Sequence, residues 1–255
     1  MQMEKSMFPG EIQKIISDRP VYSDNVGRSG ALVAFIGDEL VLKRAEKGKL
    51  ENAYLMQSYF CKNALAPEIV FYDSLDFDYL ISRRAEGKNA IAPENLQDPK
   101  RLAAALGEFL LKIHSLDASS CPVKNVMDVQ LREFDRAVIR NEGIYKHVSD
   151  YVQIDTIDEI RKTVENARPH FLNDTVLHGD YCLPNVMLSG FEGKHVIDVG
   201  EGGTGDKHFD LFWGLWSLSY NLKTDAYRNI FLDAYGKSRI QEEMICAAGC
   251  LCALI

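Results

Sequence analysis

The chain has 255 residues, of which 46% are hydrophobic, so it can bury a sizeable core in one large domain or two small ones. Its 37 acidic and 29 basic residues give a formal charge of −8, and no basic stripe is visible. This balance argues against a nucleic-acid partner and favours attraction of a cationic small molecule.

The six cysteines do not form a small disulfide framework in a chain of this length, so we expect free thiols in a reducing compartment. Near the C-terminus, Cys246, Cys250 and Cys252 lack a histidine or a fourth ligand nearby. We interpret them as small buried hydrophobic residues rather than a metal site. The first ten residues lack the apolar segment of a signal peptide, and no apolar tract is long enough to span a membrane. We therefore expect a soluble, cytoplasmic protein.

The N-terminal third predicts an antiparallel sheet with one helix packed on it. No glycine or proline interrupts the segment between Gly48 and Pro67, which predicts a helix. The pair Gly37-Asp38 is typical of the turn that joins two strands of a hairpin. We also expect a short helix at 11–17 and five strands, at 21–22, 31–36, 39–44, 69–72 and 78–82.

A loop of small residues, DNVGRSG, runs from Asp24 to Gly30, between the first two predicted strands. Such a loop can bring backbone N–H groups close to phosphates, and Ser29 adds a hydroxyl. In isolation the G-x-x-G pattern favours an ordinary turn. Its interpretation therefore depends on the residues that follow.

A change in composition marks the boundary between two lobes. The run Arg83-Arg84-Ala85-Glu86-Gly87 leads into a polar, proline-containing passage that ends at Pro99. We divide the chain there, into residues 1–86 and 87–255.

Helical patterns dominate the second part. Asp98, followed by a proline, is a typical N-cap, and Asp206 is the expected N-cap of a later helix. Residues 209–220 are apolar on nearly all sides, which predicts a buried helix with Trp213 and Trp216 in the core. Amphipathic helices are expected at 127–140 and 157–167, and the helix after Asp98 carries an apolar stripe of Leu102, Leu106, Phe109, Leu110 and Ile113.

The strongest functional signal lies between Val176 and Gly205. Asp180, Asn185 and Asp198 fall there on short irregular backbone between apolar runs. Phosphoryl transfer needs a carboxylate to orient and deprotonate the attacking hydroxyl, and oxygen ligands that hold Mg²⁺ against nucleotide phosphates. Taken singly, each residue is more readily explained as a turn or cap residue. Together they favour a phosphotransferase.

The pattern H-G-D-x-x-x-x-N followed by I-D-x-G resembles the catalytic and metal-binding segments of the aminoglycoside phosphotransferases, which have the protein-kinase fold. A second segment, H-S-x-D-x-S-x-C-P from His114 to Pro122, is similar to the aminoglycoside 3′-phosphotransferases. The resemblance extends from about Asp24 to Tyr235. It implies an α+β, protein-kinase-like fold of two lobes: a small antiparallel β-sheet lobe with one helix, then a larger, mainly α-helical lobe.

The resemblance also implies a nucleotide site. Lys43, on the third predicted strand, would hold the α- and β-phosphates, with Glu51 as its ion-pair partner. Asn185 and Asp198 would bind Mg²⁺, and Asp180 would be the catalytic base. The nucleotide would be ATP, with GTP as the alternative. Its phosphates would also meet Ser29 and Gly30, and its base would lie against the connector at Ser82 and Ala85.

On the acceptor side, the resemblance predicts acids that bind ammonium groups. Glu142 is one candidate among several acids of this region, and Asp210 is included as a second. Asp210 lies in an apolar run, where an unpaired carboxylate is costly, so we also expect it to accept hydrogen bonds from the catalytic-loop backbone. His178 would pack inward and brace that loop, and His114 would pack or hydrogen-bond at a helix end.

Two departures from the family bear on the acceptor. Glu201 stands where the family commonly has an arginine, and the C-terminal MICAAGCLCALI is apolar where the family carries acids. We predict a MgATP-dependent phosphotransferase, monomeric or a weak homodimer, acting on a hydroxyl of a small cationic molecule. An aminoglycoside 3′-hydroxyl, and hence antibiotic resistance, is the first choice. The alternatives are a metabolic kinase for an amino alcohol or sugar, and an inactive nucleotide-binding regulatory module.

Overall fold

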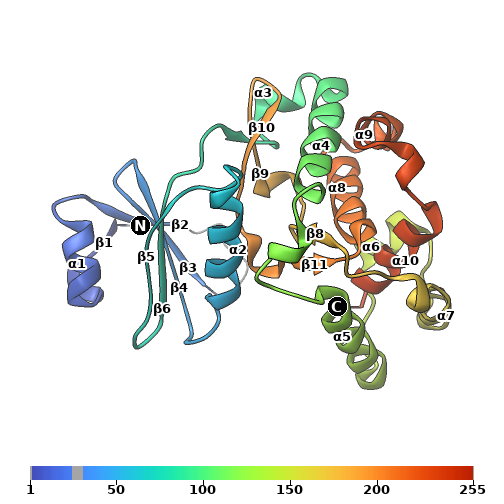
Figure 1. Ribbon diagram of the computed structural model, residues 1–255, viewed down its shortest axis with the longest axis horizontal. Helices are drawn as coiled ribbons and strands as arrows, with labels where there is room; N and C mark the ends of the chain where they lie inside the picture. The colour runs from blue at the N-terminus through green and yellow to red at the C-terminus, as the bar shows by residue number, and fades with distance from the viewer. Residues whose placement is uncertain (1, 25–30, 255) are drawn as a thin grey trace.

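The computed structural model describes residues 2–24 and 31–254. Figure 1 shows a part built on a β-sheet beside a larger, mainly helical part, as the kinase-like α+β fold requires. The N-terminus lies on the sheet side, and the C-terminus lies near helices α5 and α10. Ser29 and Gly30, the candidate phosphate-binding residues, fall outside the described residues.

The sheet of the first part has six strands in the order β1-β2-β3-β4-β6-β5, and all neighbours are antiparallel. The prediction of five strands was wrong by one, because Gln2–Met3 pairs with the next strand and is too short to show a sequence period. The strands are β1 (Gln2–Met3), β2 (Val21–Asp24), β3 (Leu32–Ile36), β4 (Leu40–Ala45), β5 (Ile69–Ser74) and β6 (Asp78–Arg83).

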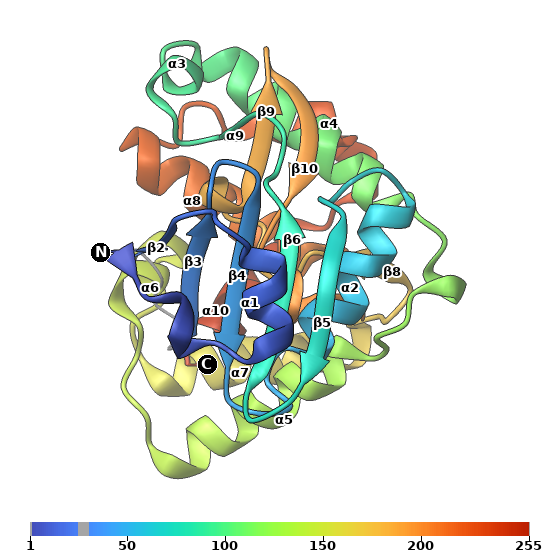
Figure 2. The same cartoon turned by 90° about the vertical axis from the view of Figure 1, so that its left-hand side faces the viewer.

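The two faces of this sheet are covered by different helices. Helix α1 (Gly10–Ile16) lies over one face, where Figure 2 shows it in front of the strands. Side chains alternate along a strand, so Leu40 and Leu42 of β4 pack in the α1 cluster while Lys43 points to the opposite face. Helix α2 (Glu51–Lys62) covers that opposite face. The alternation therefore turns Lys43 toward the helical part of the molecule.

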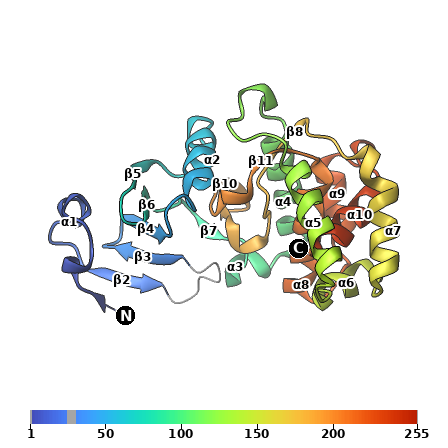
Figure 3. The ribbon, with the colours of Figure 1, turned by 90° about the horizontal axis from the view of Figure 1, so that it is seen from below.

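Helix α2 lies between the sheet and the helical part (Figures 1 and 3). One side of it packs on the sheet through Ala53, and another contributes Met56 and Phe60 to the large core of the helical part. Just beyond the helix, the Leu65 carbonyl accepts a hydrogen bond from the Val196 N–H at 2.7 Å. The helix is thus a shared element of two cores.

The connector after β6 joins the sheet part to a second, three-stranded sheet in the order β10-β9-β7. Gly87 has a φ of +87°, and a Cβ there would overlap the backbone carbonyl of Leu188. Only glycine allows this approach. The strands are β7 (Lys88–Asn89), β9 (Val186–Ser189) and β10 (Glu192–Val196), and a separate pair comprises β8 (Thr175–Leu177) and β11 (Gly203–Gly205).

Helix boundaries in the second part follow the predicted caps. The Asp98 carboxylate accepts the Arg101 N–H at 3.2 Å, and the Asp206 carboxylate accepts the His208 N–H at 2.9 Å. All five residues of the predicted stripe on α4 are buried. The helices are α3 (Pro93–Leu96), α4 (Pro99–His114), α5 (Val126–Arg140), α6 (Lys146–Val152), α7 (Ile157–Ala167), α8 (Lys207–Leu222), α9 (Arg228–Tyr235) and α10 (Glu242–Cys252), with 3₁₀ turns at Lys5–Met7, Ala118–Ser120, Arg168–His170, Leu183–Asn185, Val199–Glu201 and Lys237–Arg239.

The six cysteines are free thiols at buried or partly buried positions. Among the described residues, no three His, Cys, Asp or Glu side chains gather as a metal cage. No described helix has the length and hydropathy needed to cross a membrane.

Candidate active site

The candidate site is centred on an ion pair between the two parts of the molecule. The Lys43 ammonium, on β4, lies 2.7 Å from Oδ1 of Asp198, 155 residues further along the chain. The Asp198 side chain is 62% exposed, so it can reach a ligand from this position. The expected convergence of these distant residues is confirmed.

Electrostatics keep the Asp198 carboxylate charged. Burial alone raises its pKa, but the Lys43 ammonium outweighs that effect, so the pKa lies below its usual value. Asp198 also has left-handed backbone, with φ +62° and ψ +45°, which Asp tolerates better than most residues. The turn directs its side chain back toward β4.

The predicted ion pair between Lys43 and Glu51 was wrong. Among the described residues, Lys43 pairs with Asp198, and Glu51 is an exposed residue in the first turn of α2. A carboxylate in the first turn of a helix is stabilised by the helix dipole, which accounts for Glu51 without a lysine partner.

The catalytic-loop candidates contact one another directly. The Asn185 side-chain amide donates to Oδ2 of Asp180 at 2.9 Å and to the Asp180 carbonyl at 3.0 Å. Because the carboxylate requires a donor, this contact turns the Asn185 amide oxygen away from Asp180. Burial and the adjacent Asp180 raise the pKa of the Cys182 thiol, so it stays protonated beside the carboxylate. No sequence pattern pointed to this thiol.

His178 is buried and braces the loop, as predicted. Its Nδ1 accepts the Asp180 N–H at 3.1 Å, so the proton must sit on Nε2, which donates to the Ile197 carbonyl at 2.9 Å. One imidazole therefore ties the catalytic loop to the segment that precedes Asp198.

Asp210 holds the same loop through hydrogen bonds to its backbone. Its side chain is 0% exposed, and its carboxylate accepts the backbone N–H groups of His178 at 2.6 Å and Gly179 at 2.9 Å. The expected hydrogen bonds to the loop are confirmed. The predicted substrate-binding role of Asp210 was wrong, because a fully buried carboxylate cannot contact a substrate. Nε2 of His114, at the end of α4, donates to Oδ2 of Asp210 at 3.2 Å, so its Nδ1 accepts the Tyr235 hydroxyl at 2.8 Å, in the predicted structural role.

Beside the catalytic loop lies a cavity of about 560 Å³. Asp180 lines it, and so does Glu142, the predicted substrate-binding candidate. Glu133 and Arg140 of α5 also line the cavity. They lie at helical spacing, so the amphipathic pattern of this helix in the sequence could have placed them on one face. The remaining lining residues are Val129, Gln130, Ala137, Gly179, Glu201, Phe209, Trp213 and Leu254.

The prediction that Trp213 is a core residue was wrong. Trp213 is only partly buried and lines the cavity, so it is a wall residue rather than pure core. Leu254 comes from the apolar C-terminal segment, which therefore reaches this cavity. Neither residue is distinguishable from a core residue in the sequence.

The connector between the parts keeps a backbone N–H without a protein partner among the described residues. The Arg84 N–H bonds to the Glu39 carbonyl at 2.8 Å, and the Glu86 N–H bonds to Nδ1 of His195 at 3.0 Å. In the described part of the chain no such partner takes the Ala85 N–H between them. Ser82 lies in β6, opposite Val41 and Ile69, at the start of the same connector.

The residues present fit a magnesium ion. The exposed Asp198 carboxylate and the outward amide oxygen of Asn185 are oxygen donors of the kind Mg²⁺ prefers. Two protein donors suit an ion that also keeps water and phosphate ligands.

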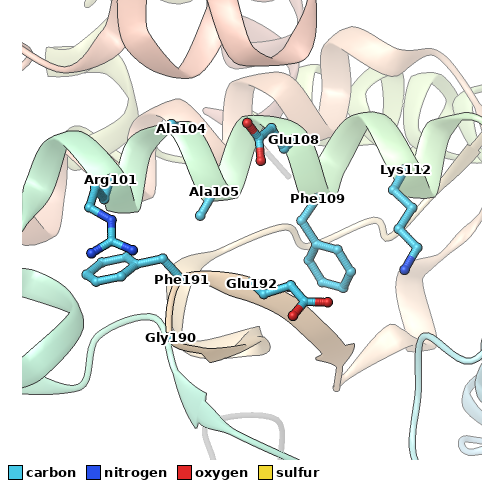
Figure 4. A pocket seen from close by; sticks show the side chains of 10 residues that line it. Arg101, Ala104, Ala105, Glu108, Phe109, Lys112, Gly190, Phe191 and Glu192 are labelled. Carbon is cyan, nitrogen blue, oxygen red and sulfur yellow. The ribbon is translucent and has the colours of Figure 1, made fainter.

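A second hollow, of about 480 Å³, lies between α4 and the β9–β10 turn. Figure 4 shows the Arg101 guanidinium over the Phe191 ring at its edge, where the two are 4.5 Å apart, with Phe109 and Lys112 further along α4. None of the phosphoryl-transfer candidates lines it. We therefore place the site at the first cavity.

The chain belongs to the phosphotransferase enzyme family, whose sequence pattern matches residues 25–244. A probable aminoglycoside 3′-phosphotransferase of Lactococcus lactis subsp. lactis is 36% identical over 246 residues, which cover 95% of this chain and 93% of that protein. An aminoglycoside 3′-phosphotransferase of Niallia circulans is 29% identical over 170 residues, covering 66% of this chain and 64% of that protein.

Solved structures agree on the fold. The crystal structure of an aminoglycoside-3′-phosphotransferase of type VIII superposes with a TM-score of 0.74 at 23% identity, covering 98% of this chain and 96% of that one. An aminoglycoside phosphotransferase of Streptomyces rimosus, solved with ADP and streptomycin, gives a TM-score of 0.71 at 16% identity, covering 90% and 94%. The protein-kinase-like fold of the aminoglycoside phosphotransferases is thus confirmed.

Proposed function

We propose that this protein transfers the γ-phosphoryl group of MgATP to a hydroxyl of an aminoglycoside, with the 3′-hydroxyl as first choice, and so confers resistance. The observation that carries the proposal is the Lys43–Asp198 pair at 2.7 Å, which assembles the nucleotide side of the site next to the Asp180 loop. The 36% identical Lactococcus lactis protein supports the acceptor class.

The residues divide the reaction between them. Asp180 faces the cavity and accepts the proton of the acceptor hydroxyl as that oxygen attacks the γ-phosphorus, while the bond to the β-phosphate oxygen breaks and ADP leaves. Asn185 holds one oxygen of Asp180 at 2.9 Å, which fixes the orientation of the base. Lys43 binds nucleotide phosphates, and the Ala85 N–H binds the base. Asp198 and Asn185 would hold Mg²⁺, which would neutralise charge on the phosphates.

The cavity accounts for a cationic acceptor. Acidic side chains in a hollow attract cations and raise their local concentration. Glu142 and Glu133 line the cavity, but each also contacts an arginine: Glu142 contacts Arg140 at 3.2 Å, and Glu133 contacts Arg136. An acceptor ammonium group therefore competes with an arginine at either position.

The organisation of the chain follows from the same proposal. Residues 1–86 carry Lys43 and the connector that binds the nucleotide base, and residues 87–255 carry the two Mg²⁺ ligands, the catalytic base Asp180 and the acceptor cavity. We place the protein in the cytoplasm, where ATP is supplied and its free thiols stay reduced, and we propose that it acts as a monomer or weak homodimer.

The test is a mass-shift assay with purified protein, MgATP or MgGTP, and a panel of aminoglycosides that includes one without a 3′-hydroxyl. A gain of about 80 Da, one phosphoryl group, on every member except the 3′-deoxy compound supports the proposal. Phosphorylation of amino alcohols or sugars alone would identify a metabolic kinase instead. Nucleotide binding without hydrolysis or transfer would identify an inactive module.

A further inference from the structure

Glu201 occupies a constrained position at the acceptor cavity. It ends the 3₁₀ turn Val199–Glu201 that follows Asp198, and it lines the cavity together with Gly179 and Asp180. Gly179 has a φ of +88°, and a Cβ there would overlap the Glu201 backbone carbonyl. The close packing of these two backbones fixes the backbone of Glu201, and hence the start of its side chain, next to the catalytic base.

The charges in the cavity are unequally compensated. Glu142 and Glu133 each have an arginine partner, and the Asp180 carboxylate accepts the Asn185 amide. Within residues 2–24 and 31–254, no hydrogen bond or ion pair engages the exposed Glu201 carboxylate. Of the three glutamates that line the cavity, Glu201 is therefore the one that can take a cation without displacing an arginine.

The cation that Glu201 binds could be a metal ion or an ammonium group of a substrate, and the neighbours of Glu201 favour the ammonium group. Asp198, three residues earlier, contacts Lys43 on the nucleotide side. Glu201 instead shares the cavity with Phe209 and Trp213, whose apolar and aromatic surfaces suit an organic ammonium group better than a hydrated metal ion. Glu201 therefore lies at the cavity rather than on the nucleotide side.

We propose that Glu201 is a specificity-determining residue, which binds an ammonium group of the acceptor close to the hydroxyl presented to Asp180. The enzyme thereby prefers acceptors with an amino group near the target hydroxyl over otherwise identical acceptors with a hydroxyl there. This inference rests on the proposed function and adds the position of the ammonium group.

The test compares two aminoglycosides that differ only by an amino group or a hydroxyl on the phosphorylated ring. Steady-state kinetics are measured for the wild type, Glu201→Gln, Glu201→Arg and the control Glu11→Gln. Glu11 is an exposed acid of α1, so its variant makes the same change in net charge far from the cavity. The KM for MgATP and the Mg²⁺ dependence are measured for each variant.

We expect Glu201→Gln to raise KM about tenfold for the amino compound, the value of one charge-assisted hydrogen bond, and Glu201→Arg to raise it further. The KM for the hydroxyl compound and for MgATP should stay within about twofold in Glu201→Gln, as should every value in Glu11→Gln. Equal effects on both acceptors, or a changed KM for MgATP or Mg²⁺, would overturn the inference. If the wild type phosphorylates neither compound, the proposed function itself fails.

Discussion

Asp210 offers the sharpest test of how the catalytic loop is held. Its fully buried carboxylate accepts two backbone N–H groups, from His178 and Gly179. In Asp210→Asn, one side-chain oxygen remains as an acceptor, but the new NH₂ group faces an N–H donor. The variant loses one charge-assisted hydrogen bond and leaves a buried donor unpaired, at a cost of about 3 kcal/mol.

For a protein of this size, that loss corresponds to a fall in Tm of roughly 6–12 °C. The same change frees the backbone that carries Asp180, so kcat should fall by more than about tenfold even well below the new Tm. Thermal denaturation followed by circular dichroism gives the first quantity. Kinetics at about 20 °C below the melting transition give the second.

Asp206→Asn is the matched control. Asp206 is also a buried acid that accepts backbone N–H groups, from His208 at 2.9 Å and Leu172 at 2.9 Å, but it caps α8 and does not contact the catalytic loop. It should lower Tm and leave the kcat of the folded enzyme nearly unchanged. If Asp210→Asn keeps its Tm within about 2 °C, or loses stability without losing kcat, the proposed support of the loop is refuted.

Three further variants probe the site. Asp180→Ala should lower kcat by at least about a thousandfold while nucleotide affinity, measured by calorimetry, stays unchanged; normal turnover would remove Asp180 from the mechanism. Lys43→Met should weaken nucleotide binding and destabilise the protein by less than about 1 kcal/mol, because the Asp198 side chain is 62% exposed and screened. The pKa of Asp198 is lowered, so the stability that the ion pair contributes is complete above the usual value of 3.8 and is lost as pH falls through the lowered pKa. The Tm of the wild type and that of Lys43→Met, plotted against pH, should therefore converge in acid. A Tm difference that stays constant with pH would contradict this. Gly179→Ala should abolish turnover and lower Tm by several degrees, because a Cβ overlaps the Glu201 carbonyl, whereas Gly10→Ala, with open space around it, should do neither.

The sequence predicted the contacts that depend on fixed offsets within short segments. Asp180 and Asn185 are five residues apart on one loop, and the loop geometry brings their side chains together at 2.9 Å. Asp198 follows a strand that runs beside that loop, so its position follows from the strand order. The cost of an unpaired buried carboxylate correctly indicated that Asp210 must accept hydrogen bonds.

Other features depend on information that a local pattern does not contain. Glu51 was assigned to Lys43 from the resemblance, but the partner is decided by the tertiary contact with Asp198. Trp213 lies on a helix that is apolar on nearly all sides, and such a pattern does not separate a cavity wall from the core. The strand at Gln2–Met3 is too short to show alternation.

Helix α2 has a consequence for how this molecule unfolds. Phe60 and Met56 of this helix are buried among side chains of the helical part, although the helix precedes the connector in the chain. Cleavage or truncation of the chain at the connector would separate these side chains from their apolar neighbours and expose a hydrophobic surface on both fragments. Neither half is therefore expected to survive alone, and heating should melt the whole enzyme in one cooperative step rather than lobe by lobe.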